Sequence, residues 1–158
     1  MDSAQLIKAF AATVQASSHG LSCLEPVLQC EQKLLTGNDP AMLDQVVAEK
    51  LELLRQLEYS VQARERLQKV AGVPAGLDGG GQLVETLNQP TLSADWQTLC
   101  GLARRVAKLN DRNGQLAVQG QHATRTALGI LTGRGSEEDT YSALKRKRGG
   151  NGYILGRV

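Results

Sequence analysis

Aromatic residues are scarce in this 158-residue chain, at 3% of its residues. The five are Phe10, Tyr59, Trp96, Tyr141 and Tyr153. Pockets for nucleotides, flavins or sugars are commonly lined by aromatic side chains, so the composition argues against such a pocket. We therefore expect no cofactor and no small-molecule substrate.

Histidine and cysteine are scarce as well, and no catalytic or metal-binding pattern is present. His19 and His122 are far apart in the sequence, and neither belongs to a group of three or four metal-binding residues, which argues against a metal site. The sequence has no nucleophile elbow, dinucleotide fingerprint or paired carboxylates. Gly79-Gly80-Gly81 lacks the Lys-Ser/Thr that follows in a phosphate-binding loop. We predict that the protein is not an enzyme.

Three cysteines, Cys23, Cys30 and Cys100, are too few for a disulfide framework. Cys23 and Cys30 are seven residues apart on a predicted helix, or about 10.5 Å along its axis. That separation exceeds the roughly 7 Å limit for a disulfide, so we expect reduced, mostly buried thiols. No run of 18 apolar residues and no signal peptide occurs, which predicts a cytoplasmic protein without a membrane span.

What the sequence does have is apolar residues at helical spacing. The stretch from Trp96 to Leu131 runs without proline and would form a helix about 54 Å long. Its apolar stripe comprises Leu99, Leu102, Val106, Leu109, Leu116, Ala123, Ala127 and Ile130. A helix of this length needs long partners, so we predict an all-α fold: an elongated, coiled-coil-like antiparallel bundle of three long helices with a flexible C-terminal tail.

The predicted helices cover about residues 3–36, 40–71 and 94–132 of a bundle spanning 1–133. Gly37, Asp39 and Pro40 mark the turn between the first two helices. The Gly- and Pro-rich residues 72–92 predict a long loop with at most one short helix near 82–87, followed by a cap at Ser93. The expected core includes Ile7, Val14, Leu21, Leu28, Leu43, Leu54, Leu57, Val106, Leu109, Leu116 and Ile130.

Charge is distributed unevenly along the chain. Residues 1–100 contain 7 Lys/Arg against 12 Asp/Glu, whereas residues 101–158 contain 11 against 4. Residues 134–158 predict a basic, partly mobile tail, because glycines surround the like charges of 145–148. The split favours either attraction between acidic and basic helices or two surfaces with different partners.

The middle of the long stretch is unusual, since Asn110, Asn113 and Gly114 stand where a seam would carry larger apolar residues. One interpretation is that the asparagines fix the register of the helices, as a buried Asn does at a seam position. The other is that this part of the helix lines a groove for a partner. The sequence leaves both open.

Two segments resemble a known family, the FlgN-type flagellar export chaperones. One is LNDRNGQLAVQGQHATRTALGIL (109–131) with Thr140 and Tyr141 after it, and the other is TGNDPAMLDQVVAEKLELLRQLE (36–58). The resemblance implies a cytoplasmic chaperone for type III protein export. Such a protein binds the C-terminal helical segments of hook-associated proteins 1 and 3, which form the hook–filament junction, and delivers them to the export gate.

Candidate site residues follow from the resemblance and the unusual helix together. For client binding they are Asn110, Asn113, Leu116, Ala117 and Gly120. For docking to the cytoplasmic domain of the export gate, the resemblance points to Tyr141. We expect Lys145, Arg146, Lys147 and Arg148 to assist through their charge.

Two alternative functions remain. A homo-oligomeric coiled-coil structural protein would use the same seams for self-association. A nucleic-acid-binding protein would use the basic tail, although four charges would give only weak, salt-sensitive binding.

Overall fold

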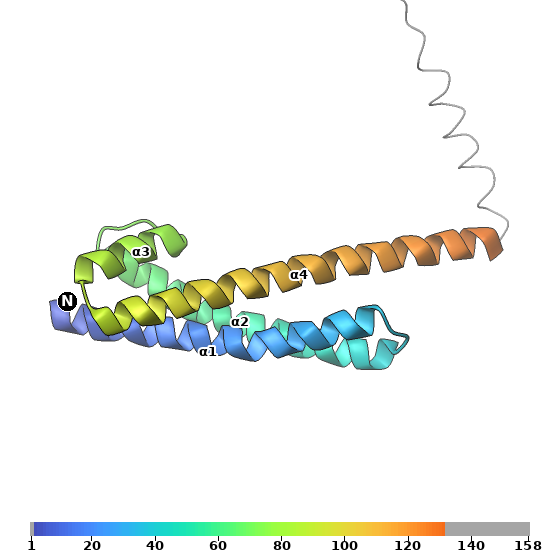
Figure 1. Ribbon diagram of the computed structural model, residues 1–158, viewed down its shortest axis with the longest axis horizontal. Coiled ribbons are helices and arrows are strands. Elements are labelled where there is room, and N and C mark those ends of the chain that lie inside the picture. Colours follow the sequence, from blue (N-terminus) through green and yellow to red (C-terminus); the bar gives the residue numbers. More distant parts are fainter. Residues whose placement is uncertain (1, 132–158) are drawn as a thin grey trace, which may run out of the picture. The chain divides into compact units, whose positions relative to one another are not determined.

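A computed structural model describes residues 2–131, and this part of the chain is helical with short connections. Its helices are α1 (Ser3–Leu35), α2 (Pro40–Val70), α3 (Gly76–Leu87) and α4 (Pro90–Leu131) (Figure 1). The predicted all-α class with three long helices is confirmed for these residues. The predicted tail at 134–158 lies outside them, as do Tyr141, Lys145, Arg146, Lys147 and Arg148.

The chain divides into two compact units, residues 1–116 and 117–158. The first holds α1, α2, α3 and α4 up to residue 116. In the second, the structure describes the α4 residues 117–131. The elongated antiparallel bundle of all three long helices stays a prediction. Within residues 2–131, no helix is both long and apolar enough to cross a membrane.

α1 and α2 lie side by side and are joined by a short turn (Figure 1). The Asp2 carboxylate accepts the Ala4 amide at 2.6 Å and caps α1. Asp39 caps α2 by accepting the Met42 amide at 3.0 Å, and Pro40 occupies the first helical turn. The turn predicted from Asp39 and Pro40 is therefore confirmed. Pro26 lies inside α1 and does not end it.

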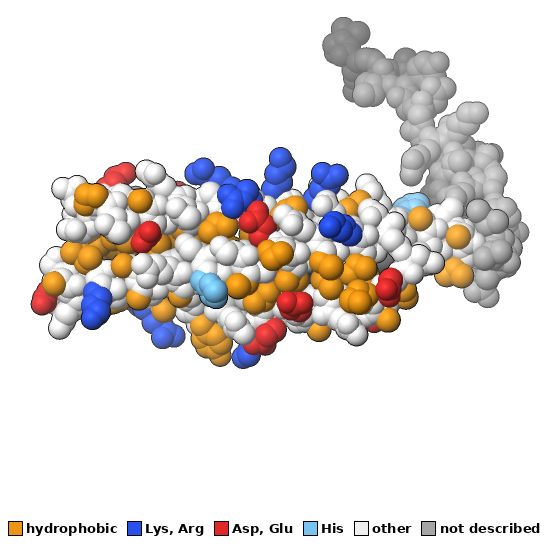
Figure 2. Space-filling model, turned by 60° about the horizontal axis from the view of Figure 1, so that its bottom comes forward, with side chains coloured by type: hydrophobic (Ala, Val, Ile, Leu, Met, Phe, Trp, Pro, Cys, Tyr) orange, Lys and Arg blue, Asp and Glu red, His pale blue; other side chains and the backbone are white. Residues whose placement is uncertain are grey.

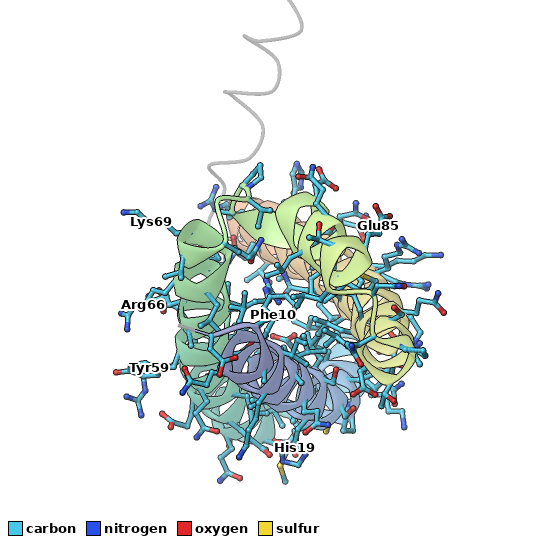
Figure 3. The ribbon with its side chains drawn as sticks, turned by 90° about the vertical axis from the view of Figure 1, so that its left-hand side faces the viewer. Phe10, His19, Tyr59, Arg66, Lys69 and Glu85 are labelled. Carbon is cyan, nitrogen blue, oxygen red and sulfur yellow. The ribbon has the colours of Figure 1, made fainter. Side chains whose placement is uncertain are left out.

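The core of the first unit lies where α1, α3 and α4 bring their buried apolar side chains together, with half-buried leucines of α2 against them. Phe10 is fully buried at its centre, and its ring lies 5.9 Å from that of Trp96 (Figure 3). The buried members of the cluster are Phe10, Val14, Leu21, Leu24, Leu28, Leu83, Val84, Leu92, Trp96, Leu99, Leu102 and Val106.

The expected core is partly corrected. Leu54 is 39% exposed, so its placement in the core was wrong. Ile7, Leu43, Leu57, Leu109 and Leu116 are only half-buried, and the side chain of Ile130 lies outside the described residues. The thiols were also expected to be mostly buried, but Cys30 is exposed and Cys23 and Cys100 are half-buried.

The predicted connection at 72–92 is partly corrected as well. The one short helix allowed near 82–87 is α3, which begins earlier, at Gly76, and α4 begins at Pro90 rather than after Ser93. Ser93 lies in the first turn of α4, where its backbone amide donates to the Gln89 carbonyl at 2.9 Å. Asn88 ends α3 in a left-handed conformation (φ 48°), so Pro90 can start the next helix only two residues later.

Close packing explains why a glycine-rich segment forms α3. A Cβ atom on Gly80 would lie 2.2 Å from the Trp96 ring, and one on Gly79 would lie 1.8 Å from the Pro74 carbonyl oxygen. Each glycine costs about 1 kcal/mol of helix propensity relative to alanine. In return, Gly80 lets the backbone of α3 approach the Trp96 ring, and Gly79 lets it approach the Pro74 carbonyl. The loop predicted at these glycines failed because propensity alone cannot register these tertiary contacts.

Candidate partner-binding surface

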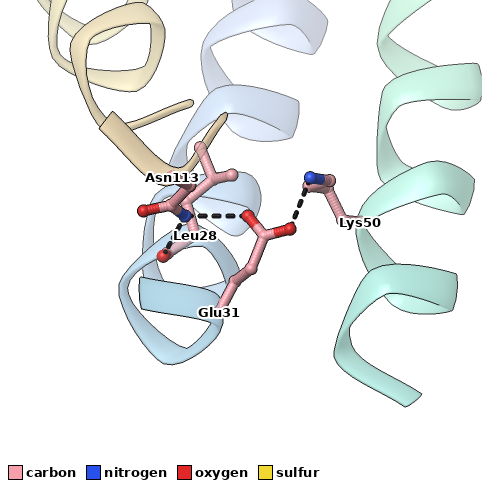
Figure 4. A network of polar contacts seen from close by, with 4 residues as sticks. All are labelled: Leu28, Glu31, Lys50 and Asn113. Carbon is pink, nitrogen blue, oxygen red and sulfur yellow. Dashed lines mark hydrogen bonds and ion pairs between the residues drawn. The ribbon is translucent and has the colours of Figure 1, made fainter. Parts of the chain in front are cut away.

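Asn113 joins α4 to α1 through a buried polar contact (Figure 4). Its side-chain amide donates to the Leu28 carbonyl oxygen at 2.8 Å and to a carboxylate oxygen of Glu31 at 2.7 Å. The other Glu31 oxygen accepts from the Lys50 ammonium group of α2 at 2.5 Å. Asn113 is 2% exposed. One carboxylate of α1 therefore binds a residue of α4 and a residue of α2.

This contact can be made in one register only, because a shift of α4 along α1 would separate the amide from both of its acceptors. Glu31 is itself buried, so losing Asn113 would leave a buried carboxylate oxygen without that donor. The two buried hydrogen bonds from Asn113 to α1 are the kind of contact that the register-fixing interpretation requires. The side-chain oxygen of Asn113 has no hydrogen-bond partner within the described residues.

The other client-binding candidates lie in different surroundings. In the first unit, Asn110 is exposed and Leu116 is half-buried. In the second unit, Ala117 is half-buried and Gly120 is exposed. Asn113 thus points into the first unit while Asn110 faces solvent. The client-binding role of these five residues stays a prediction.

An apolar stripe on α2 was missed by the sequence analysis as a surface feature. Leu51 and Leu54 are 59% and 39% exposed, and Leu43 and Val47 beside them are half-buried. Figure 2 shows apolar side chains gathered on the side of the molecule that it presents. This stripe lies on α2 next to the residues that face the core. The sequence does contain a sign of it, because the apolar residues of α2 cover a wider sector of the helix than packing against one neighbouring helix requires.

α4 presents basic side chains to solvent in the first unit. Arg104, Lys108 and Arg112 follow one another at intervals of four residues, and all three are exposed. They border a shallow hollow that is also lined by Ala107, Asp111 and Gln115. Side chains four apart lie on one side of a helix, so this row offers a positive edge to a partner.

Ion pairing on the other side of α4 ties it to α1. Arg105 donates to Glu25 at 2.9 Å, and this hydrogen bond holds the pKa of the Glu25 carboxyl below its ordinary value.

Arg64 of α2 is buried, with its guanidinium 5.6 Å from the centre of the Trp96 ring. Burial lowers the pKa of Arg64, and the ring face compensates part of the lost hydration.

In the second unit, the α4 residues 118–128 are all exposed to solvent. Val118 is 66% exposed. Within residues 2–131, no three His, Cys, Asp or Glu side chains are grouped so that they could hold a metal ion. The described surface offers apolar stripes and charged edges, which are features suited to contact with another protein.

No curated protein and no solved structure matches the chain. The family model described as FlgN protein matches residues 1–149. Because this match covers most of the sequence, the chain belongs to the FlgN family of flagellar export chaperones.

Proposed function

We propose that this protein is a cytoplasmic flagellar export chaperone that binds the C-terminal helical segments of hook-associated proteins 1 and 3. The exposed apolar stripe of α2 is the observation that carries the proposal, with Leu51 59% exposed on a long helix. Solvent exposure of such leucines is unfavourable by about 25 cal/mol per Å² of apolar surface. An amphipathic client helix would remove that surface from water.

The three long helices would act as an elongated antiparallel bundle that holds its client along its length. Client binding by α4 would involve Asn110, Leu116, Ala117 and Gly120, with Asn113 keeping the helix in register. Client segments that become ordered only in the complex give up several kcal/mol of the interaction. A moderate affinity suits a chaperone, because the client must be released for export.

Delivery to the export gate would use residues beyond the described part of the chain. Tyr141 would dock on the cytoplasmic domain of the gate, and the basic residues 145–148 would assist through charge. Tyrosine contributes a large contact area with few rotatable bonds to immobilise. We expect Tyr141→Ala to keep client affinity and to weaken the affinity of the client-loaded chaperone for the purified gate domain. Unchanged gate affinity would refute this role.

The decisive experiment is binding of the full chain to the purified C-terminal segments of hook-associated proteins 1 and 3, followed by sedimentation of the mixture. A defined complex with a client that persists in high salt is expected, because apolar contacts survive salt that disrupts phosphate contacts. Stable self-association without client binding would favour the homo-oligomeric structural protein instead. Salt-sensitive binding to duplex DNA alone would favour the nucleic-acid alternative.

A further inference from the structure

α3 occupies a position between α2 and α4 for only part of their length. Its first residue, Gly76, donates its amide to Glu65 of α2 at 3.3 Å, and its carbonyl accepts from Gln68 at 2.9 Å. On the other side, Gly80 packs against Trp96 of α4. Figure 3, which looks along the helices, shows α3 between α2 and α4. With 12 residues, α3 is about 18 Å long.

The face of α2 that meets α3 continues well beyond α3. An α-helix repeats its direction after about 18 residues, or five turns. Counting back from Glu65 along this line gives Val61, Leu54 and Val47, with Leu51 close beside it. Val47, Leu51 and Leu54 belong to the apolar stripe of α2, and the half-buried Val61 lies between them and Glu65. The stripe is therefore a direct continuation of the α2 surface that α3 covers.

The face of α4 that meets α3 continues in the same way. Counting forward from Trp96 gives the half-buried Cys100 and Ala103, and then the exposed Ala107, Asn110 and Gly114. A Cβ atom on Gly114 would have no neighbour within 4 Å. All of these side chains are small or absent, so a helix could approach this face closely, as α3 approaches Trp96 through its own glycines.

Both faces keep their common orientation at the far end of the first unit, because Glu31 of α1 contacts both helices there. It accepts from Asn113 of α4 and from Lys50 of α2 (Figure 4). We call the continuation of the two faces the fourth-helix surface. It consists of Val47, Leu51, Leu54 and Val61 on α2 and of Cys100, Ala103, Ala107, Asn110 and Gly114 on α4.

We propose that the fourth-helix surface binds one amphipathic client helix, which continues the position of α3 between α2 and α4. This inference rests on the proposed chaperone function and names where, and by what chemistry, the client binds. The span from Cys100 to Gly114 is about 21 Å and that from Val47 to Val61 is about 21 Å, so the bound helix has about four turns.

Charge complementarity defines the client further. Asp44 and Glu58 border the α2 side, where Arg55 is already paired with Glu52 at 2.9 Å. Arg104 and Lys108 border the α4 side, with Asp111 between basic residues. The fitting client helix carries Lys or Arg on the flank toward α2, Asp or Glu on the flank toward α4, and an apolar stripe between the flanks.

The native cysteines provide a test on the full-length chain. Cys100 lies on the fourth-helix surface, whereas the exposed Cys30 lies on α1. Alkylation by a small maleimide is followed by mass spectrometry, with and without saturating C-terminal segments of hook-associated proteins 1 and 3. We expect client binding to slow the modification of Cys100 at least tenfold while Cys30 keeps its rate, which reports on solvent access at each thiol.

Substitutions test the same surface from both helices. The double variant Leu51→Glu, Leu54→Glu places charge on exposed positions, and Gly114→Leu fills the open face of α4 while improving helix propensity. We expect each to weaken client binding about tenfold or more. The matched controls are Tyr59→Glu on another side of α2 and Thr98→Leu on α4, an exposed position 16 residues before Gly114 and about 160° around the helix axis from it. Both controls should bind the client like wild type.

Each alternative outcome is distinct. If clients bind the wild type but Cys100 stays reactive and both variants bind normally, the inference is wrong and the proposed function stands. If no client binds the wild type, both fail. If Cys100 is slow to react without client, independently of protein concentration, the chain's own C-terminal residues cover the surface. Concentration-dependent protection would instead indicate a second copy. Either of these last results overturns the proposal.

Discussion

α4 is attached to the rest of the first unit in two contrasting ways. Near Trp96 the contact is apolar and close, with Phe10 on one side and the backbone of Gly80 on the other. Near Asn113 the contact is polar, and Glu31 holds both the amide and Lys50. Apolar burial stabilises in proportion to area and tolerates sliding, whereas hydrogen bonds fix position. The first attachment thus supplies stability and the second supplies register.

The two ends of the first unit also differ in how far the facing sides of α2 and α4 are covered. At the Trp96 end, α3 covers the space between α2 and α4, and the side chains there are buried. Toward Asn113 no described helix covers the same faces, and Leu51 and Leu54 stay exposed. The contact between Asn113 and Glu31 holds α4 in place there, although no described helix packs over these faces.

Removing the ring at the apolar attachment should have the largest effect. Trp96→Ala is expected to lower the free energy of unfolding by about 3–5 kcal/mol, since it empties the space between Phe10 and Gly80. Denaturant titration of the full chain measures this. Tyr59→Ala is the control, because Tyr59 is 66% exposed and its loss should change stability by less than about 0.5 kcal/mol. Equal losses would show that Trp96 is not the main apolar contact.

Adding one methyl group sharpens the comparison. Gly80→Ala places a Cβ 2.2 Å from the Trp96 ring and should cost about 1–3 kcal/mol by overpacking. Gly114→Ala makes the same chemical change in open space, and it should stabilise the protein by about 1 kcal/mol through helix propensity. Thermal melting of the two variants should therefore shift in opposite directions. A shift of the same sign would contradict the close approach of α3.

Asn113→Leu tests the polar attachment. It leaves the Leu28 carbonyl and one Glu31 oxygen without their donor, at a cost of about 1–3 kcal/mol. We expect lower stability or a changed oligomeric state, measured by melting and sedimentation, as register loss predicts. Lost client binding with unchanged melting and helicity would instead support a direct client contact at Asn113.

The smallest effect is expected at the surface ion pair between Arg105 and Glu25. Arg105 holds the folded-state pKa of Glu25 below its ordinary value of 4.5. The pair therefore contributes stability above that pH, and the contribution disappears as the pH falls through the lowered pKa. Arg105→Gln should melt slightly below wild type near neutral pH and together with it in acid. A difference that persisted in acid would assign another role to Arg105.

Local signals in the sequence were sufficient for much of the fold. Asp39 and Pro40 predicted the turn between α1 and α2, and apolar spacing predicted the three long helices, because capping and periodicity act over a few residues. The same signals failed at Gly79 and Gly80, which lie inside α3 where a Cβ would meet the Pro74 carbonyl and the Trp96 ring, respectively.

The candidate site shows the same division. The sequence singled out Asn113 as an unusual seam residue but left its role open between register and client contact. Its acceptors, Leu28 and Glu31, are more than 80 residues away, so only the folded chain brings them together. Leu54 was expected inside, and its exposure depends on α3 being too short to reach it.

The sequence by itself determined the helical class, the turn between α1 and α2, and the family, because each is encoded in short-range pattern or motif. Tertiary structure decided that a glycine-rich segment is a helix, that Asn113 points inward, and that one stripe of α2 is left uncovered. These outcomes depend on which distant surfaces meet, and the free energy of such contacts is absent from any local window of sequence.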